Sequence, residues 1–406
     1  MHPMVRPALR RAWRDLQYVQ FGVAPAHAVV VGPVDTTTGS LLELLDGTRG
    51  VPLLREEARR LGVPDGWLEA LLNRLARAGL LEDTAAGGRA ADAVRREAGA
   101  LDRLRADLGS LSVVHRGPGE PMRRLAARGG MRVQVRGAGR VGAAVAALLS
   151  AAGVGRVDVR DGGRVRPWDV APGGLPPESV GERRDVAARR LVARSAPGGR
   201  AARATGGAGD VSGAGGEGGA VGAGGGGGPE PGLSLVVVAP RDGLAAYAPD
   251  PVTADTWVGT GTPHLFAGVL EATGVVGPLV LPGDSACARC VELGRVDADP
   301  AWPRLMAQWR SARRSGAVPV GDVGLAAAVA GLAAAHALAF LDGGVPASAD
   351  TRWETSSPLL EWRALRVRPH GECPCGAADR AAEWAAEWEE RERASEARGG
   401  QDTMAG

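Results

Sequence analysis

The sequence predicts an α/β protein: a Rossmann-like domain with a mainly parallel sheet, preceded by a small winged-helix-like domain. The main observation is a strand pattern that begins at Met131 and leads through a glycine-rich turn into an apolar helix and a second strand. Leucines at helical spacing fill the first 82 residues, and two close pairs of cysteines lie toward the C-terminus. A chain of 406 residues with 45% hydrophobic side chains can form two or three packed cores.

The composition argues against several classes of function. The chain has 48 basic and 46 acidic residues and no concentrated basic stripe, so nucleic acid is not an expected partner. Every Lys or Arg position is arginine, which leaves no lysine nucleophile. The N-terminal arginines are not followed by an apolar segment of signal-peptide length, and we expect a cytoplasmic protein. The apolar stretch 323–341 is mostly alanine and contains His336, which favours a buried helix over a membrane span.

The first domain is expected over residues 1–82. An extended segment at 17–33 precedes three leucine-rich helical patterns that end near Gly47, Gly62 and Leu80. The pattern LLELLDGTRG, followed by LEALLNRLARAGLLED, is similar to the PqqD-like peptide-recognition domains of peptide-modifying enzyme systems. A generic winged helix is the alternative interpretation.

Residues 83–130 connect this domain to the next one. They are rich in arginine, alanine and glycine and contain a helical pattern at 91–108, so we expect a linker with a helix.

The second domain begins with a strand, a glycine-rich turn and a helix. Gly137 and Gly139 would let the backbone approach a diphosphate, while Gly142 would let the helix pack closely on the strand. The helix N-terminus adds free N–H groups and a positive dipole. Asp161 ends the second strand about 20 residues on, where an acid can accept hydrogen bonds from ribose hydroxyls. An ordinary tight turn in an α/β sheet is the alternative.

The second domain is expected to extend over residues 131–377. A glycine-rich segment at 205–232 is predicted to be a disordered insertion within it. Apolar stretches at 233–238, 264–269 and 277–282 are predicted to be further strands of the same sheet. The charged tail, 378–406, is predicted to form a solvated helix that frays.

The cysteines form the pairs Cys287/Cys290 and Cys373/Cys375. Two thiolate pairs can make a closed, structural Cys₄ zinc site, and a reducing compartment argues against two disulfides. The second pair is one residue closer than the usual spacing; free or redox-active thiols are the alternative, as is replacement of one thiolate by His370. If all four cysteines bind zinc, none remains for a thioester intermediate.

Six segments in this order resemble the ThiF/MoeB family, the bacterial relatives of ubiquitin-activating enzymes, over roughly residues 110–377. They are VQVRGAGRVGAAVAALLSAAGVGRVDVRDGGRV, VGERRDVAARRL, LSLVVVAPRD, GPLVLPGDSACARC, VPVGDVGLAAAVAGLAAAHALAFLDG and LRVRPHGECPCG. The resemblance implies a ThiF fold that binds ATP with Mg²⁺ and adenylates the C-terminal carboxylate of a protein or peptide. It also implies a split zinc site and a homodimer.

The resemblance also assigns individual residues. The nucleotide phosphates would lie at Gly137, Gly139 and Gly142, and the ribose at Asp161. The family's Asn-Leu-x-Arg motif, whose Asn and Arg contact the triphosphate, falls on residues 169–172, where neither side chain is present. Arg184 takes the place of the family's lysine, with a different reach. Asp242 is the candidate for the magnesium-binding acid, although Pro240 and Arg241 displace it.

Three functions remain after this comparison. The first is a ThiF-like adenylyltransferase that activates a small carrier protein or a precursor peptide. The second is a degenerate member that binds a peptide for a separate enzyme, as partners of YcaO-type cyclodehydratases do when azoline rings are installed in ribosomal peptides. The missing Asn and Arg favour the second. A nicotinamide-dependent oxidoreductase would also use the glycine turn and Asp161, but it does not explain the cysteine pairs.

Overall fold

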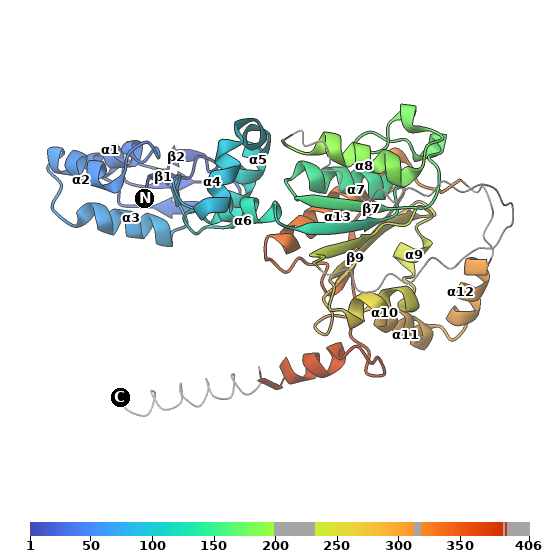
Figure 1. Cartoon of the computed structure of the whole chain (residues 1–406). Helices are drawn as coiled ribbons and strands as arrows, with labels where there is room; N and C mark the ends of the chain where they lie inside the picture. The colour runs from blue at the N-terminus through green and yellow to red at the C-terminus, as the bar shows by residue number, and fades with distance from the viewer. Residues whose placement is uncertain (199–231, 312–317, 385, 388–406) are drawn as a thin grey trace, which may run out of the picture. The chain divides into compact units, whose positions relative to one another are not determined.

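The computed structural model describes residues 1–198, 232–311, 318–384 and 386–387 (Figure 1). These residues divide into two compact units, one built mainly from residues 1–130 and the other from the rest of the chain. The predicted insertion, except for Gly232, and most of the predicted tail lie outside the described residues.

The first unit begins with five short strands and three helices, in the region where the sequence predicts a winged-helix-like domain. Its three helices lie where the leucine patterns predict them, and each buries the leucine face of its sequence. Asp35 caps the first helix by accepting a hydrogen bond from the Thr38 N–H at 2.7 Å. The elements are β1 (Pro3–Val5), paired with β5 (Leu81–Asp83); the antiparallel strands β2 (Arg11–Trp13), β3 (Val19–Phe21) and β4 (Val29–Val31); and α1 (Thr36–Leu44), α2 (Val51–Arg60) and α3 (Trp67–Arg77).

Residues 88–128 form three helices where the sequence analysis expects a linker with one. They are α4 (Gly88–Arg96), α5 (Ala98–Val114) and α6 (Glu120–Arg128). Ala91, Leu104 and Leu125 are buried together in a small core of their own. Arginines and glycines lie between these apolar positions and make the helical spacing hard to detect in the sequence. The three helices are stabilised by packing against one another.

Arg6 joins the winged-helix part to this helical part. Its guanidinium is fully buried, forms an ion pair with Glu82 at 3.1 Å and donates to the carbonyl oxygens of Leu81, Ser112 and Arg116. A buried guanidinium is stable only when it is paired and hydrogen-bonded, so these contacts hold the two parts of the unit together.

The second unit is built on a seven-stranded sheet with the order β12-β11-β10-β9-β8-β6-β7. Strands β7, β6, β8 and β9 are parallel, and the pairs from β9 to β12 are antiparallel, so the sheet is mixed. The strands are β6 (Arg132–Arg136), β7 (Arg156–Arg160), β8 (Leu235–Val238), β9 (His264–Leu270), β10 (Thr273–Val280), β11 (Thr351–Ser356) and β12 (Arg363–Arg366).

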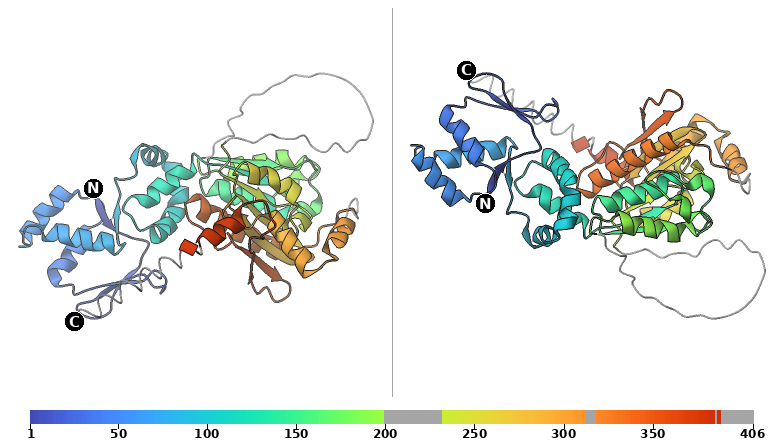
Figure 2. Two further views of the ribbon diagram at one scale, coloured as in Figure 1. Left: turned by 90° about the horizontal axis from the view of Figure 1, so that it is seen from below. Right: turned by 90° about the horizontal axis from the view of Figure 1, so that it is seen from above.

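Helices cover both faces of this sheet. One face carries α7 (Arg140–Ala151), α8 (Arg184–Ser195) and α13 (Val323–Leu341), which lie side by side in Figure 2. The other face carries α9 (Leu244–Tyr247), α10 (Pro251–Gly259) and α11 (Ala288–Ala298). Two short 3₁₀ helices, η1 (Pro167–Asp169) and η2 (Pro177–Ser179), precede α8, and α12 (Trp302–Ser311) follows α11.

Helix α13 is long and apolar enough to cross a membrane by length and composition alone. It packs against β9 and β10, and Leu325 and Val329 on its sheet-facing side are buried. Asp322 caps the helix by accepting a hydrogen bond from the Leu325 N–H at 2.8 Å. These contacts identify α13 as a core helix of the α/β unit, in agreement with the buried helix that the sequence predicts.

A buried histidine predicts how this unit responds to acid. His264 is fully buried between the rings of Trp257 and Phe266, and burial lowers its pKa to about 4 despite a hydrogen bond to the Thr262 carbonyl. The unfolded chain therefore takes up this proton first as the pH falls. The stability that neutral His264 contributes is complete above pH 6.5 and is lost progressively down to about pH 4.

We expect His264→Leu to remove about 3 kcal/mol of the decline in unfolding free energy between pH 7 and pH 4. Urea denaturation of wild type and variant across this range measures the effect. Parallel stability curves for the two proteins would contradict this account of the buried imidazole.

Candidate functional site

The glycine-rich turn lies between β6 and α7, at the carboxyl edge of the parallel strands. Gly137 has a φ of +107°, and a Cβ atom there would lie 2.0 Å from the Ala239 carbonyl oxygen at the end of β8. A Cβ atom on Gly142 would lie 2.1 Å from the Gly137 carbonyl oxygen. Both glycines are therefore required by the close approach of the turn to its neighbours. Gly139 differs, since its missing Cβ would face the side chain of Arg241 at 3.2 Å.

Asp161 follows β7 and is held against the same turn. Its Oδ2 atom accepts a hydrogen bond from the Ala138 N–H at 2.9 Å, and its Oδ1 atom accepts one from the Gly163 N–H at 2.8 Å. Burial would raise the pKa of Asp161, but these hydrogen bonds and the contact with Arg184 outweigh burial and lower it. The carboxylate is thus ionised and fixed beside the turn, at the position where the sequence predicts a ribose contact.

Arg184 is the first residue of α8 and reaches back to the turn. Its Nη2 atom lies 2.8 Å from Asp161 Oδ1, and its Nη1 atom lies 3.6 Å from Asp169 Oδ2. Nη1 also donates to the Arg164 carbonyl oxygen at 2.8 Å. The structure therefore brings the predicted cation Arg184 to the predicted ribose acid, and the two form an ion pair.

Arg241, rather than Asp242, is the residue of the β8 loop that reaches the glycine turn. Its Nε atom donates to Asp169 Oδ1 at 2.6 Å, and its Cζ atom lies 5.9 Å from the centroid of the Trp168 ring. Asp242 is exposed and does not line the cavity at the turn. Sequence analysis passed over Arg241, although its place one residue beyond Pro240 at the carboxyl end of a parallel strand is a signal for ligand binding.

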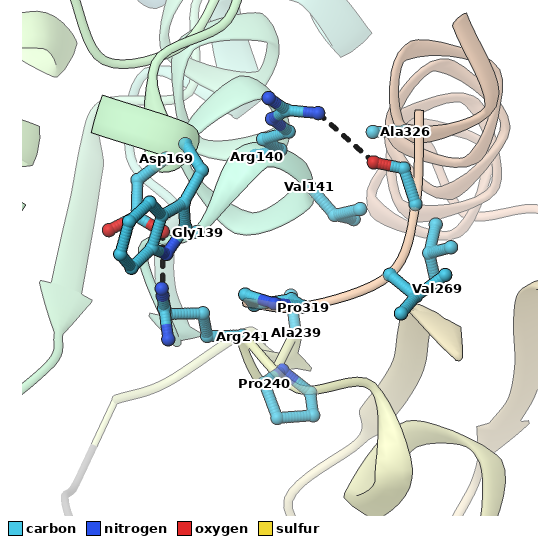
Figure 3. Close-up of a pocket in the computed structure, with 13 residues that line it drawn as sticks. Gly139, Arg140, Val141, Asp169, Ala239, Pro240, Arg241, Val269, Pro319 and Ala326 are labelled. Atoms are coloured by element: carbon cyan, nitrogen blue, oxygen red, sulfur yellow. Dashed lines mark hydrogen bonds and ion pairs between the residues drawn. The ribbon is translucent and has the colours of Figure 1, made fainter. Parts of the chain in front are cut away.

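A cavity of about 40 Å³ lies at the turn, beside Gly139, Asp169 and Arg241 (Figure 3). In Figure 3, Arg241 extends toward Asp169, and Arg140 extends toward the segment before α13, where its Nη1 atom donates to the Gly321 carbonyl oxygen at 3.0 Å. The lining residues are Gly139, Arg140, Val141, Trp168, Asp169, Ala239, Pro240, Arg241, Val269, Pro319, Val320, Gly321 and Ala326.

Three side chains that line this cavity have a buried N–H group without a hydrogen-bond acceptor among the described residues. These groups are the Nε atom of Arg140, the Nε1 atom of Trp168 and the Nη2 atom of Arg241. Buried donors are nearly always paired in folded proteins. Their number beside a helix N-terminus makes the cavity suited to a ligand with anionic oxygen atoms.

The four cysteines form a separate cluster, apart from the residues that line the cavity. Cys287 and Cys290 belong to the start of α11, and Cys373 and Cys375 follow β12. The Sγ atoms of successive neighbours lie 3.5, 3.6 and 3.8 Å apart, and all four lie within 4.8 Å of one another. Tetrahedral thiolate ligands at about 2.3 Å from zinc would be about 3.8 Å apart. The cluster therefore has the dimensions of a metal site.

The alternative ligand His370 does not join the cluster. Its Nε2 atom pairs with Asp297 at 2.8 Å, and its Nδ1 atom accepts a hydrogen bond from the Glu372 N–H at 3.1 Å. Within the cluster, Cys287 donates to Cys290, which raises the pKa of Cys287 and lowers that of Cys290.

The glycine turn generates a prediction about stability. We expect Gly142→Ala to lower the free energy of unfolding by about 2–3 kcal/mol, because the new methyl group would overlap the Gly137 carbonyl. Gly331→Ala is the matched control, since this glycine is also helical and has open space around it. That change should raise the same free energy by about 0.5–1 kcal/mol. Equal effects in chemical denaturation would show that the close contact at Gly142 does not exist.

Comparison with known proteins places these features in context. The ThiF family profile matches residues 128–375, and no curated protein sequence matches. The structure of E. coli MccB with ATP superposes with a TM-score of 0.61 at 13% identity, covering 92% of this chain and 99% of that one. MccB in complex with N-formylated MccA gives 0.60 at 13% identity and covers 93% and 100%.

The heterocyclase TruD gives a TM-score of 0.56 at 14% identity and covers 93% of this chain but 43% of its own. At these identities the superpositions establish a shared fold only. The family profile covers more than half of the chain, including the glycine turn, the seven-stranded sheet and the cysteine cluster. The chain therefore belongs to the ThiF family.

Proposed function

We propose that this protein is an ATP-dependent adenylyltransferase that activates the C-terminal carboxylate of a precursor peptide or a small carrier protein. The observation that carries the proposal is a cavity at Gly139 that holds three N–H donors without an acceptor among the described residues, with the ionised Asp161 hydrogen-bonded to the same glycine turn. This set offers an acceptor for ribose hydroxyls and donors for phosphate oxygens, which are the two polar parts of a nucleotide.

In the proposed reaction a carboxylate oxygen of the substrate attacks the α-phosphorus of ATP. The bond to the bridging oxygen breaks, an acyl adenylate forms and pyrophosphate leaves. Gly137 and Gly139 would let the backbone N–H groups approach the phosphates, and Gly142 would keep α7 in place for this contact. Asp161 would bind the ribose, and Arg184 would neutralise charge on the phosphates.

The cavity of about 40 Å³ is smaller than a triphosphate, so binding requires a side chain to move. The side chain of Arg241 blocks the space that a triphosphate would need, because it lies against Gly139 and is held there by Asp169. Exchange of the Asp169 contact for a phosphate contact would open the site without losing the pairing of Arg241.

The solved structures support the choice of substrate class. The MccB structures carry ATP in one case and N-formylated MccA in another, and TruD is a heterocyclase. We extend this to the present chain as a role in ribosomal peptide biosynthesis, in the cytoplasm and as a homodimer. The winged-helix-like domain at residues 1–82 would recognise the peptide, and the unit at 131–377 would adenylate it.

A second function is a ThiF-like domain without nucleotide chemistry, which binds a peptide for a separate YcaO-type cyclodehydratase. The ion pairs favour it, since Asp161 and Asp169 are already occupied by Arg184 and Arg241. The family's Asn and Arg are also missing from residues 169–172. Loss of donors of this kind typically costs about 10²–10³ in rate for each one.

Titration calorimetry with ATP and Mg²⁺ tests the first function. We expect saturable binding by the full-length protein and no binding by Gly139→Asp, whose carboxylate would repel the phosphates at the turn. Gly259→Asp is the control, because it adds the same charge at an exposed site with open space. A folded protein that binds no ATP at about millimolar concentration would exclude the adenylyltransferase and favour the peptide-binding partner.

We also propose that the four cysteines hold a structural zinc ion, which would fix α11 to the segment after β12. Elemental analysis of purified protein should give about one zinc ion per chain. Cys375→Ser should lower both the zinc content and the Tm, by more than about 5 °C. His370→Asn should keep its zinc, since the imidazole pairs with Asp297 instead. A yield below about 0.5 ions per chain would contradict the proposal.

A further inference from the structure

We propose that arginine side chains take the place of a metal ion at the phosphate-binding cavity, so that the site binds a polyphosphate without Mg²⁺. Arg140 and Arg241, together with the indole of Trp168, are the groups that would do so. This inference rests on the proposed nucleotide site and specifies how that site holds its ligand.

The first step concerns the acidic groups, because Mg²⁺ in proteins is bound through carboxylate oxygens. Asp161 accepts hydrogen bonds from Ala138 and Gly163 and pairs with Arg184. Asp169 is 2% exposed; its Oδ1 atom accepts from Arg241 and its Oδ2 atom accepts from the Arg166 N–H at 2.9 Å. Every oxygen atom of the two carboxylates therefore already accepts from an N–H group; a ribose hydroxyl can share such an oxygen atom, whereas the donors oppose direct binding of a cation.

The remaining candidate, Asp242, does not reach the cavity. It is exposed, and it is not among the residues that line the space at the turn. The preceding residue, Arg241, occupies the position facing Gly139. At the point where the family resemblance predicts a magnesium-binding acid, the side chain that faces the turn is a cation. The residues at this cavity therefore do not fit Mg²⁺.

The second step concerns the donors. Arg140, Arg184 and Arg241 surround the turn, whereas Asp161 and Asp169 are the acids paired there. The group carries an excess of one positive charge before any ligand binds. The acceptor-free atoms at the cavity are all N–H donors, which suit phosphate oxygens and cannot bind a cation.

The third step concerns geometry. The guanidinium of Arg241 extends from the end of β8 across Gly139, beside the N-terminus of α7. A phosphate that approaches the turn would therefore meet helix N–H groups on one side and a planar fork of donors on the other. A guanidinium group can donate two parallel hydrogen bonds to two oxygen atoms of one phosphate, whereas a lysine ammonium group cannot.

The experiment is titration calorimetry of the full-length protein with ATP and with inorganic tripolyphosphate, each in Mg²⁺ buffer and in magnesium-free buffer. The magnesium-free buffer is prepared over a chelating resin, so that no chelator contacts the cysteine cluster. We expect the Kd of ATP to differ by less than about threefold between the two buffers. Tripolyphosphate should bind in both buffers and compete with ATP.

Variants identify the side chains responsible. Arg241→Gln should weaken both ligands at least tenfold in both buffers, and Arg241→Lys should restore only part of the loss. The double change Asp169→Asn with Arg241→Gln keeps the net charge and avoids an unpaired buried carboxylate, and it should weaken binding to the same extent. Arg189→Gln is the control, because this arginine pairs with Asp185 on the exposed side of α8.

The outcomes separate this inference from the proposed function. ATP binding that weakens tenfold or more without Mg²⁺ would overturn metal-free binding and leave a nucleotide site in place. Unchanged affinity in folded Arg241→Gln and in the double variant would overturn the role of Arg241. No ATP binding in either buffer would overturn the proposed adenylyltransferase together with this inference.

Discussion

The close approach of the glycine turn to the end of β8 is the constraint on which the second unit depends. The Ala239 carbonyl leaves no space for a side chain at Gly137, and the Gly137 carbonyl leaves none at Gly142. With both side chains absent, α7 can start directly above the parallel strands. The loops after β6, β7 and β8 then converge, which brings Asp161 and Arg241 to one place from segments about 80 residues apart in the sequence.

Burial of charge then determines the chemistry of this place. Asp169 is almost completely buried, and its carboxyl oxygen atoms face Arg241, Arg184 and the Arg166 N–H. Arginine is suited to such a position, since it stays charged and offers several donors in a fixed plane. The chain has arginine at every Lys or Arg position, and in the inference drawn above the arginines at this site would act as fixed cations in place of a mobile one. A ligand would enter by exchanging partners with charges that are already present.

The sequence predicted the parts of the site that depend on local patterns. The spacing of Gly137, Gly139 and Gly142, the acid at the end of β7 and the two cysteine pairs are all short-range signals; the glycines and the acid lie at the expected turn and strand end, and the four cysteines lie together. Arg184 was predicted as a cation at the turn and lies there, but the second cation, Arg241, was not predictable in this way. Arg241 and Asp242 are adjacent, and which of them points inward depends on the path of the chain after Pro240, a tertiary property. Between residues 83 and 130 the sequence predicted one helix, at 91–108, where the structure has α4, α5 and α6, since their apolar residues form a core only when all three helices pack.

The cysteine cluster also has a consequence for the unfolded chain. Cys290 and Cys375 are separated by 85 positions, and the segment between them includes α12 and α13 and the strands β11 and β12. A metal ion that joined them would close a long loop and would remove conformational entropy from the denatured ensemble, in addition to any contact it stabilises in the native state. The central helix and the antiparallel edge of the sheet would then be lost together with the rest of the unit when it melts. With such an ion the cluster would act on the cooperativity of unfolding, well beyond the residues that touch it.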